Sequence, residues 1–276
     1  MIKIIDMDKL FDKYISDYVY QNIGKIAPDE IENNIPRLYE EFGDQPLTEL
    51  EGKTPNSYYI GYTGEQLLQC LIEHLKTGVE VSDFLCEAIQ NNPENEKVIA
   101  NQLKQENDEE LTLYLMNMLC CMGSSIAVDR YLEFILWDYT EPVKELATEL
   151  LCETADKVKD AILNAFNESS DEVKVYLTQV LSYCKPDDAV FSVLINEFIL
   201  HFDQIPVYAG YLARYGDERA LPFLITCIEN DKINYQDFEE LRYAIEALGG
   251  TYDKKRDFTA DKIYKKIRAN RQKPIA

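Results

Sequence analysis

Histidine, cysteine and paired carboxylates are the side chains here that could do chemistry, and their spacing is unfavourable for it. His74 and His201 are the only histidines, and both lie within patterns typical of helices. Seven cysteines occur without a Cys-x-x-Cys pair, and the adjacent Cys120 and Cys121 cannot both face one tetrahedral zinc ion. We therefore expect structural or solvated histidines, no metal, no cofactor, and cysteines acting as small buried side chains in a reducing cytoplasm.

Motifs for phosphate binding or nucleophilic catalysis are also missing from the sequence. It contains no Gly-x-Gly-x-x-Gly run, no Walker loop and no nucleophile elbow. Carboxylate pairs such as Glu109–Glu110 and Glu239–Glu240 fall where helices are expected to begin, and there they favour the helix dipole. The sequence predicts no catalytic residue, and therefore a protein that is not an enzyme.

The net charge of −22 is the strongest constraint on partners. A surface this acidic repels phosphate backbones and anionic lipid headgroups, so neither nucleic acid nor membrane is expected as a partner. No stretch of about 20 apolar residues could span a bilayer, and Met1 is followed within six residues by an acid rather than by a basic and then apolar signal. A cytoplasmic protein is predicted.

The C-terminal segment reverses the charge of the rest of the chain. Residues 253–276 hold nine Lys or Arg against three Asp, a net of +6, which leaves −28 on residues 1–252. A helix expected at 259–271 places Ile263, Tyr264 and Ile267 close together among its basic residues. This helix could cap the body, with its lysines facing acidic groups, or it could recruit a partner.

Five expected helices repeat one apolar pattern. Each ends near a leucine, and apolar residues recur at offsets −8, −5, −4, −1 and 0, which trace one face of a helix. The spacings of 32, 30, 31 and 36 residues predict stacked helical hairpins. The aligned residues are Leu119, Leu151, Leu181, Leu212 and Leu248.

Short polar residues follow these leucines at the predicted turns. Asp or Ser five or six residues after the leucine is expected to cap the next helix, at Ser124, Asp156, Asp187, Asp217 and Asp253. A capping box is expected from Ser169 to Glu172. The intervening helices are predicted at 125–137, 157–168, 187–202 and 218–231, and earlier ones near 64–77, 82–91 and 94–105.

Residues 212–224, Leu-Ala-Arg-Tyr-Gly-Asp-Glu-Arg-Ala-Leu-Pro-Phe-Leu, resemble the short HEAT-like repeat of the phycobilisome-lyase type. The resemblance covers about 108–252, although Gly216 and Pro222 have no counterparts in the second and third units. It implies an all-α, right-handed α-α superhelix, a HEAT-like solenoid. In such arrays the second helix of each hairpin lines the concave side.

Two enzyme classes with HEAT-like repeats need residues that this sequence lacks or a charge that it disfavours. Deoxyhypusine hydroxylase holds a di-iron centre with His-Glu pairs, but here Leu75 follows His74 and Phe202 follows His201. Alkylpurine DNA glycosylases need a basic groove for the duplex, which a charge of −28 outside the tail disfavours.

The N-terminal residues lie outside the repeat pattern. Helices expected at 7–22 and 29–42, the second bent or shortened at Pro36, form a predicted cap. Residues 43–62 have no periodicity and are taken as a connector. The predicted organisation is a cap and connector at 1–62, a repeat array at 63–252, and a basic C-terminal helix or tail at 253–276.

The remaining prediction is a binding surface opposite the apolar face. Its members are expected to be exposed along the concave groove: Met116, Asn117, Thr148, Glu149, Thr178, Gln179, Ala209, Gly210, Ile245 and Glu246. The groove positions of the last two repeats, from Ala209 to Glu246, could be covered by the C-terminal helix, or the groove could hold a protein or peptide. The preferred function is a non-catalytic scaffold or binding module for a protein or peptide partner. The alternative is an enzyme or enzyme subunit with its site in the groove.

Overall fold

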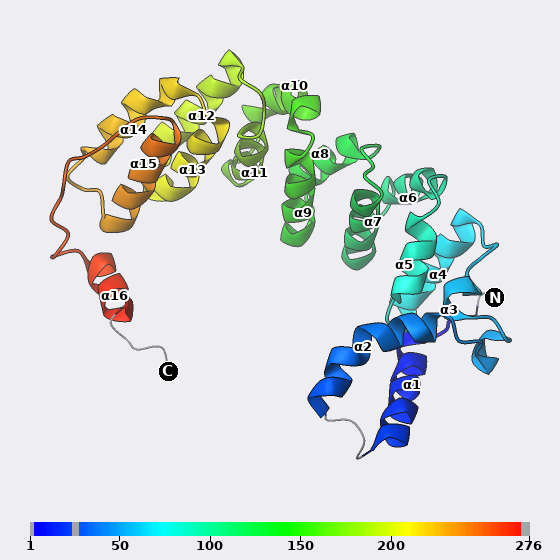
Figure 1. Cartoon of the computed structure of the whole chain (residues 1–276). Coiled ribbons are helices and arrows are strands. Elements are labelled where there is room, and N and C mark those ends of the chain that lie inside the picture. Colours follow the sequence, from blue (N-terminus) through cyan, green and yellow to red (C-terminus); the bar gives the residue numbers. More distant parts are fainter. Residues whose placement is uncertain (1–2, 24–27, 272–276) are drawn as a thin grey trace. The chain divides into compact units, whose positions relative to one another are not determined.

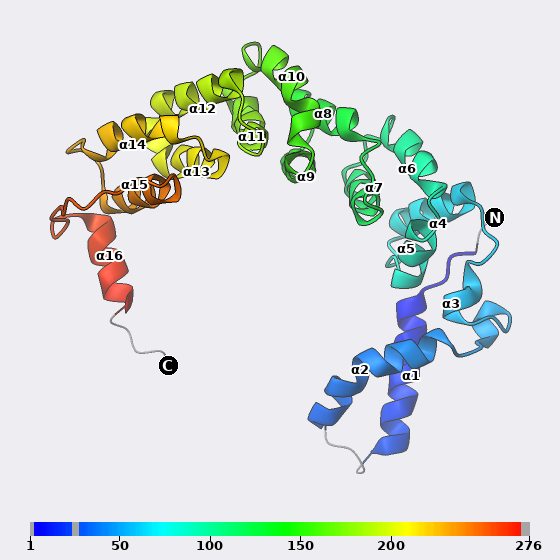
Figure 2. The ribbon, with the colours of Figure 1, turned by 45° about the horizontal axis from the view of Figure 1, so that its top comes forward.

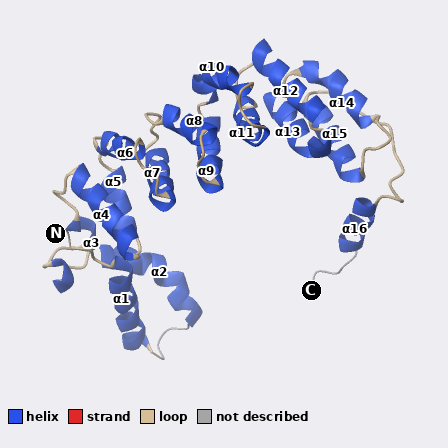
Figure 3. Cartoon of the chain, turned by 180° about the vertical axis from the view of Figure 1, so that it is seen from behind, coloured by secondary structure: helices blue, strands red, loops and turns tan. Residues whose placement is uncertain are grey.

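Helices account for all of the regular secondary structure in the part of the chain that is described. The computed structural model describes residues 3–23 and 28–271, and no strand occurs among them (Figure 3). The chain divides into two units, Met1–Arg130 and Tyr131–Ala276, with the division inside helix α8 (Val128–Leu136). The all-α prediction is confirmed, and neighbouring helices pack on one another as in a helical repeat.

The first unit contains the predicted cap, the connector and the first hairpins (Figure 1). Its helices are α1 (Met7–Asn22), α2 (Pro28–Gly43), η1 (Thr48–Leu50), α3 (Pro55–Tyr58), α4 (Gly64–Thr77), α5 (Asp83–Gln90), α6 (Asn95–Leu103) and α7 (Glu109–Cys121). The helices predicted at 7–22 and 64–77 coincide with α1 and α4. Helix α2 runs through Pro36, so the proline does not shorten it.

The second unit contains the later hairpins and the basic tail. Its helices are α9 (Glu141–Cys152), α10 (Ala155–Phe166), α11 (Asp171–Leu181), α12 (Asp188–Leu200), η2 (Phe202–Gln204), α13 (Ile205–Tyr215), η3 (Glu218–Ala220), α14 (Leu221–Ile228), α15 (Tyr235–Ala247) and α16 (Lys262–Arg271). The predicted boundaries after residues 62 and 252 do not coincide with the division into units, because cap helices and early hairpins share the first unit.

Aromatic rings join the N-terminal helices of the first unit. The ring of Phe11 on α1 lies 4.8 Å from that of Tyr39 and 5.3 Å from that of Phe42, both on α2. Tyr39 in turn stacks on Phe84 of α5 at 5.2 Å. Phe42 and Leu38 are fully buried. Because large rings bury much apolar area, this cluster fixes α1 and α2 on the helices that follow.

The connector between α2 and α4 is ordered rather than extended. Leu47 accepts a backbone hydrogen bond from Gly52 and donates one to Lys53, which closes a turn around η1. A capping box between Thr54 and Ser57 begins α3. Leu50 is buried, so the segment contributes to the core of the first unit.

The second unit has two layers of helices. Helices α9, α11, α13 and α15 lie on one side, and α10, α12 and α14 lie on the other (Figure 2). The pairs α9–α11 and α13–α15 pack side by side within their layer. The repeat leucines of this unit, Leu151, Leu181, Leu212 and Leu248, are all buried, as is Leu119 of α7 in the first unit. The five aligned leucines are therefore core positions as predicted, whereas Val207 and Tyr243, five residues before Leu212 and Leu248 on the predicted apolar face, are exposed, and for them the prediction is wrong.

Polar side chains bond consecutive turns of the second unit to one another. Lys185 donates its backbone N–H to Asp156 at 3.0 Å, and Lys159 pairs with Asp187 at 2.6 Å. The hydroxyl of Tyr215 accepts the N–H of Asp187 at 2.7 Å and donates to its carbonyl at 3.0 Å. Each contact joins residues one repeat apart, so it fixes the register of neighbouring hairpins.

Two of the predicted helix caps have the expected geometry. The carboxylate of Asp187 accepts the N–H groups of Ala189 and Val190, and that of Asp217 accepts the N–H of Arg219. Both carboxylates satisfy donors that a helix start leaves free. The hydroxyl of Ser124 accepts the N–H of Ile126, which lies in the turn before α8 begins at Val128, so Ser124 does not cap that helix.

Three further predictions about caps are wrong. Asp156 lies inside the first turn of α10 and bonds to the next hairpin instead. The cap of α11 is Ser170, because the hydroxyl of Ser169 donates to the carbonyl of Ala165. Asp253 begins no helix, because the chain after the positive φ of Gly249 is not helical.

A strap of residues 252–258 connects α15 to α16 and closes the last hairpin. Arg256 donates to the carbonyls of Ile228 and Asn230 at the end of α14, at 2.8 and 2.9 Å. Helix α16 contacts α15, and the ring of Tyr264 lies 4.9 Å from that of Tyr235. The contact of α16 with α15 agrees with a capping position, but the expectation that its lysines face acidic groups is wrong, because Lys262, Lys265 and Lys266 are exposed and form no ion pair among the described residues.

No single helix among the described residues is long and apolar enough to cross a membrane. One pair, Asp188–Leu200 with Phe202–Tyr215, passes that test by length and composition only and is bent by 89°.

Candidate functional site

The predicted groove residues divide into a buried set and a more exposed set. The residues three positions before each leucine are at most 1 % exposed: Met116, Thr148, Thr178, Ala209 and Ile245. The prediction that they face an open groove is wrong. Solvent and partners reach them poorly because the neighbouring helices of the same layer pack against that side.

The two threonines of the buried set show how polar residues occupy these positions. The hydroxyl of Thr148 donates to the carbonyl of Lys144 at 2.7 Å, and that of Thr178 donates to the carbonyl of Lys174 at 2.6 Å. A hydroxyl satisfied within its own helix can be buried at little cost. A polar residue opposite the apolar face is therefore no proof of exposure.

The residues two positions before each leucine remain accessible. Asn117, Glu149 and Glu246 are exposed, and Gln179 and Gly210 are half-buried. Asn117 belongs to the first unit, and the other four belong to successive helices of one layer in the second unit. This part of the predicted surface is where a partner could make contact.

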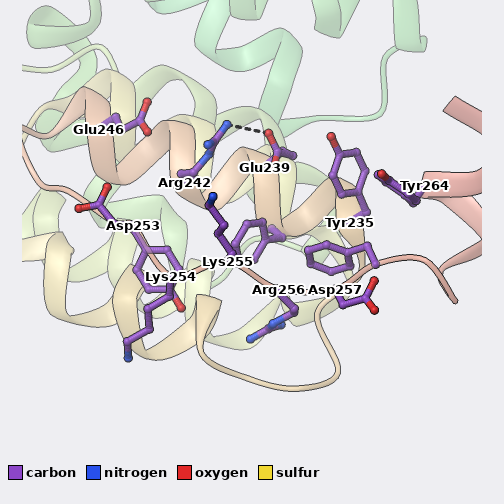
Figure 4. A pocket seen from close by; sticks show the side chains of 13 residues that line it. Tyr235, Glu239, Arg242, Glu246, Asp253, Lys254, Lys255, Arg256, Asp257 and Tyr264 are labelled. Carbon is purple, nitrogen blue, oxygen red and sulfur yellow. Dashed lines mark hydrogen bonds and ion pairs between the residues drawn. The ribbon is translucent and has the colours of Figure 1, made fainter. Parts of the chain in front are cut away.

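Glu246 lies beside a cavity of about 430 Å³ between α15, the strap and α16 (Figure 4). Five rings form its apolar part: Tyr235, Phe238, Tyr252, Phe258 and Tyr264. The ring of Phe238 lies 5.1 Å from that of Phe258 and 5.9 Å from that of Tyr252. Rings held edge to face by one another leave a preformed aromatic surface for a ligand side chain.

Charged side chains surround these rings. Arg242 forms an ion pair with Glu239 at 2.8 Å, and Lys254 pairs with Glu229. The guanidinium of Arg256 lies 5.5 Å from the centre of the Phe238 ring while it bonds to the end of α14. Lys255 is exposed at the rim, as is Glu246 (Figure 4). The cavity therefore combines an apolar floor with a rim of both charges.

A second depression, of about 440 Å³, lies on the exposed face of α15 and shares Glu239, Arg242 and Glu246 with the first. It adds Tyr243, whose side chain is 66 % exposed, and Glu240. An exposed tyrosine among carboxylates can contact both an apolar and a basic group. The face of α15 is the part of the predicted groove that has such relief.

The histidines have structural contacts. His74 is buried, and its Nδ1 lies 2.8 Å from the carbonyl of Glu80. The ring of His201 stacks on that of Tyr208 at 4.7 Å, and its Nε2 lies 3.2 Å from the carboxylate of the buried Glu197. Among the described residues, no group of three or more His, Cys, Asp or Glu could hold a metal ion.

The described cysteines form no disulfide; Cys70 and Cys184 are buried, and Cys86, Cys152 and Cys227 are half-buried. Burial raises the pKa of Cys152 to about 12 and that of Cys70 and Cys227 to about 11, which disfavours their reactive thiolates. Cys120 and Cys121 differ, because both are exposed on α7. The prediction that the cysteines act as buried side chains is wrong for these two.

The sequence predicted a basic helix at 259–271 but not the strap at 252–258 that precedes it. The one available signal was the run of aromatic residues Tyr252, Phe258 and Tyr264 beside those of α15. Rings at irregular spacing in a segment without helical periodicity indicate packing against a neighbour. That neighbour could not be named without the fold.

Comparison with known proteins gives no relative: no family model matches the chain, and neither the curated proteins nor the solved structures contain a match.

Proposed function

We propose that this protein is a non-catalytic interaction module built as a HEAT-like solenoid, and that it binds a segment of a partner protein on the exposed face of α15. One observation carries the proposal: Glu246, a residue of the predicted groove, lies between the aromatic cavity and the depression around Tyr243. The repeated hairpins of the second unit supply a fixed support for this face. The reducing cytoplasm remains the proposed location, in accord with seven free cysteines.

The chemistry of the face defines the partner segment. Glu240 and Glu246 are exposed on it, whereas Arg242 already pairs with Glu239. A segment with an aliphatic or aromatic anchor for the ring-lined cavity, and with Lys or Arg beside it, would complement these groups. A basic protein segment is thus preferred over nucleic acid or an anionic membrane.

The test is affinity capture from the native host with the full-length protein, quantified for each captured protein. Glu246→Lys and Tyr243→Ala should each reduce capture of the specific partner by about tenfold or more. The matched control is Glu168→Lys, which makes the same charge change at an exposed residue away from α15. Equal capture by all variants would show that α15 is not the binding face.

The sequence-based alternative, an enzyme or enzyme subunit with a site in the groove, leads to a different result. Such a protein would convert a bound small molecule. The α15 variants Glu246→Lys and Tyr243→Ala would then lower its activity without lowering the capture of a partner protein.

A further inference from the structure

The corner between α12 and α13 exposes a cluster of large apolar side chains. Ile199, Leu200, Phe202 and Val207 are 55 %, 71 %, 43 % and 41 % exposed, and all four lie within nine residues of the chain. Single exposed apolar residues are ordinary, but a cluster of this kind marks a contact surface. We call these four residues the corner patch.

The corner patch lies in a stretch that carries acids and no strong base. Residues 186–213 contain no lysine or arginine, and Asp203 is exposed between Phe202 and the start of α13. Burial, followed by the nearby carboxylates, Glu197 first and Asp203 among them, raises the pKa of Tyr208 to about 12. Asp187 and Asp188 pair with Lys159 and Arg219, and Glu197 is buried beside His201, so the exposed carboxylate at this apolar corner is Asp203.

Helix α16 has the opposite character. Lys262, Lys265, Lys266 and Arg268 are exposed on it, while Ile263 and Ile267 are half-buried. In the described part of the chain, none of these four cations forms an ion pair; Lys265 donates to the carbonyl of Ala260 in its own turn. The contact between Tyr264 and Tyr235 holds the helix on α15 and leaves the basic face open.

We propose that α16 of one copy docks on the corner patch of a second copy. The aliphatic stems of its lysines and Ile267 would cover Leu200 and Phe202, and its ammonium groups would face Asp203. Both surfaces belong to the second unit, and the proposal is that two copies exchange α16 reciprocally, which closes the contact as a dimer. This self-association does not depend on the face of α15 that we propose for the partner.

The experiment measures dimerisation of the full chain by sedimentation equilibrium, at protein concentrations up to about 100 μM. Leu200→Asp, and separately Lys265→Glu with Lys266→Glu, should each weaken the dimer by about tenfold or more. Raising the salt from about 50 to about 500 mM should weaken the unmodified dimer, because the charged part of the contact is screened. Circular dichroism melting of each variant checks that it remains folded.

A charge exchange makes the test specific. A chain with Asp203→Lys presents a cation at the corner and keeps a basic α16, and a chain with Lys262→Glu, Lys265→Glu and Lys266→Glu keeps Asp203 at the corner and has an acidic α16. Each should be monomeric alone, whereas an equimolar mixture should form a heterodimer, since both contacts then join opposite charges. A control mixture uses Asp231→Lys in place of Asp203→Lys, at an exposed residue outside the corner; that chain should dimerise without its partner.

Recovery of the heterodimer supports the proposal. A chain that stays monomeric at all these concentrations overturns it. A dimer that is lost with Leu200→Asp but unchanged by reversal of the α16 charges also overturns it, because the corner patch would then contact another corner patch.

Discussion

The N-terminal helices and the later hairpins are held together by different chemistry. Aromatic rings of Phe11, Tyr39 and Phe42 fix α1 and α2, whereas the turns from α10 to α14 are joined by ion pairs and hydrogen bonds. Rings give apolar area and tolerate small displacements. Hydrogen bonds need a defined distance and angle, so they select one register among hairpins with similar apolar faces. Repeated hairpins could pack in more than one register, so they need contacts that select one, whereas the N-terminal cap has no repeated neighbour to be confused with.

The largest effect is expected from truncation of a ring in the first unit. Phe42→Ala should lower the free energy of unfolding by about 3–5 kcal/mol, because it removes a fully buried side chain from the aromatic cluster. Leu181→Ala in the second unit should cost about 2–5 kcal/mol. Urea unfolding followed by circular dichroism measures both, with the exposed Tyr20→Ala as control. A loss below about 1 kcal/mol for Phe42→Ala would contradict the importance of the rings.

The strap of the second unit should give the next largest effect. Arg256→Ala removes two hydrogen bonds to the end of α14 and the contacts of the guanidinium with Phe238 and Phe258. The expected loss is about 2–3 kcal/mol in the free energy of unfolding. Lys255→Ala, at the exposed neighbouring residue, is the matched control. If the two variants melt alike, the strap does not stabilise the last hairpin.

A single hydroxyl tests the polar contacts between turns. Tyr215→Phe leaves the ring in place but deprives the N–H of Asp187 of its acceptor, which should cost about 1–2 kcal/mol. Tyr243→Phe removes an exposed hydroxyl and should change stability little. Thermal melting of both variants gives the comparison. Equal melting temperatures would mean that register depends on apolar packing alone.

The smallest effect is a dependence of stability on pH. The hydrogen bond from Lys159, with backbone N–H groups, lowers the pKa of Asp187 below its usual 3.8. Because the pKa of Asp187 is lower in the folded than in the unfolded chain, its ionised carboxylate stabilises the folded state above about pH 4. This stabilisation is lost as the pH falls through the pKa of the folded state. Asp187→Asn should therefore flatten the dependence of the urea midpoint on pH below about pH 4, relative to the unmodified chain. The control Asp231→Asn, at an exposed residue, should leave that dependence unchanged.

Helix positions followed well from local chemistry. The N-cap of α1 is Asp6, and α4 begins with a Thr63–Gln66 capping box and ends at Gly78, so both ends are encoded nearby. The 218–231 prediction was less accurate, because the chain forms η3 and then a shorter α14. The chain there first forms the 3-10 helix η3, and α14 begins only at Leu221, next to Pro222.

The binding surface followed less well, for a physical reason. The periodicity of one helix identifies a buried face, but a helix in a layered repeat is also covered by neighbours at its sides. Met116 and Ile245 are apolar at the misassigned positions, and Thr148 satisfies its hydroxyl locally. Their burial depends on helices some thirty residues away. Glu246 stayed exposed because it lies one residue further around its helix.

The spacing of the polar contacts has a consequence for how the chain acquires its structure. From Glu96 onward, the described side-chain hydrogen bonds between hairpins join residues 25 to 32 positions apart. Such short loops cost little entropy to close, and low contact order favours rapid folding. During synthesis, each hairpin can dock on the preceding one as soon as it leaves the ribosome, without waiting for the C-terminus.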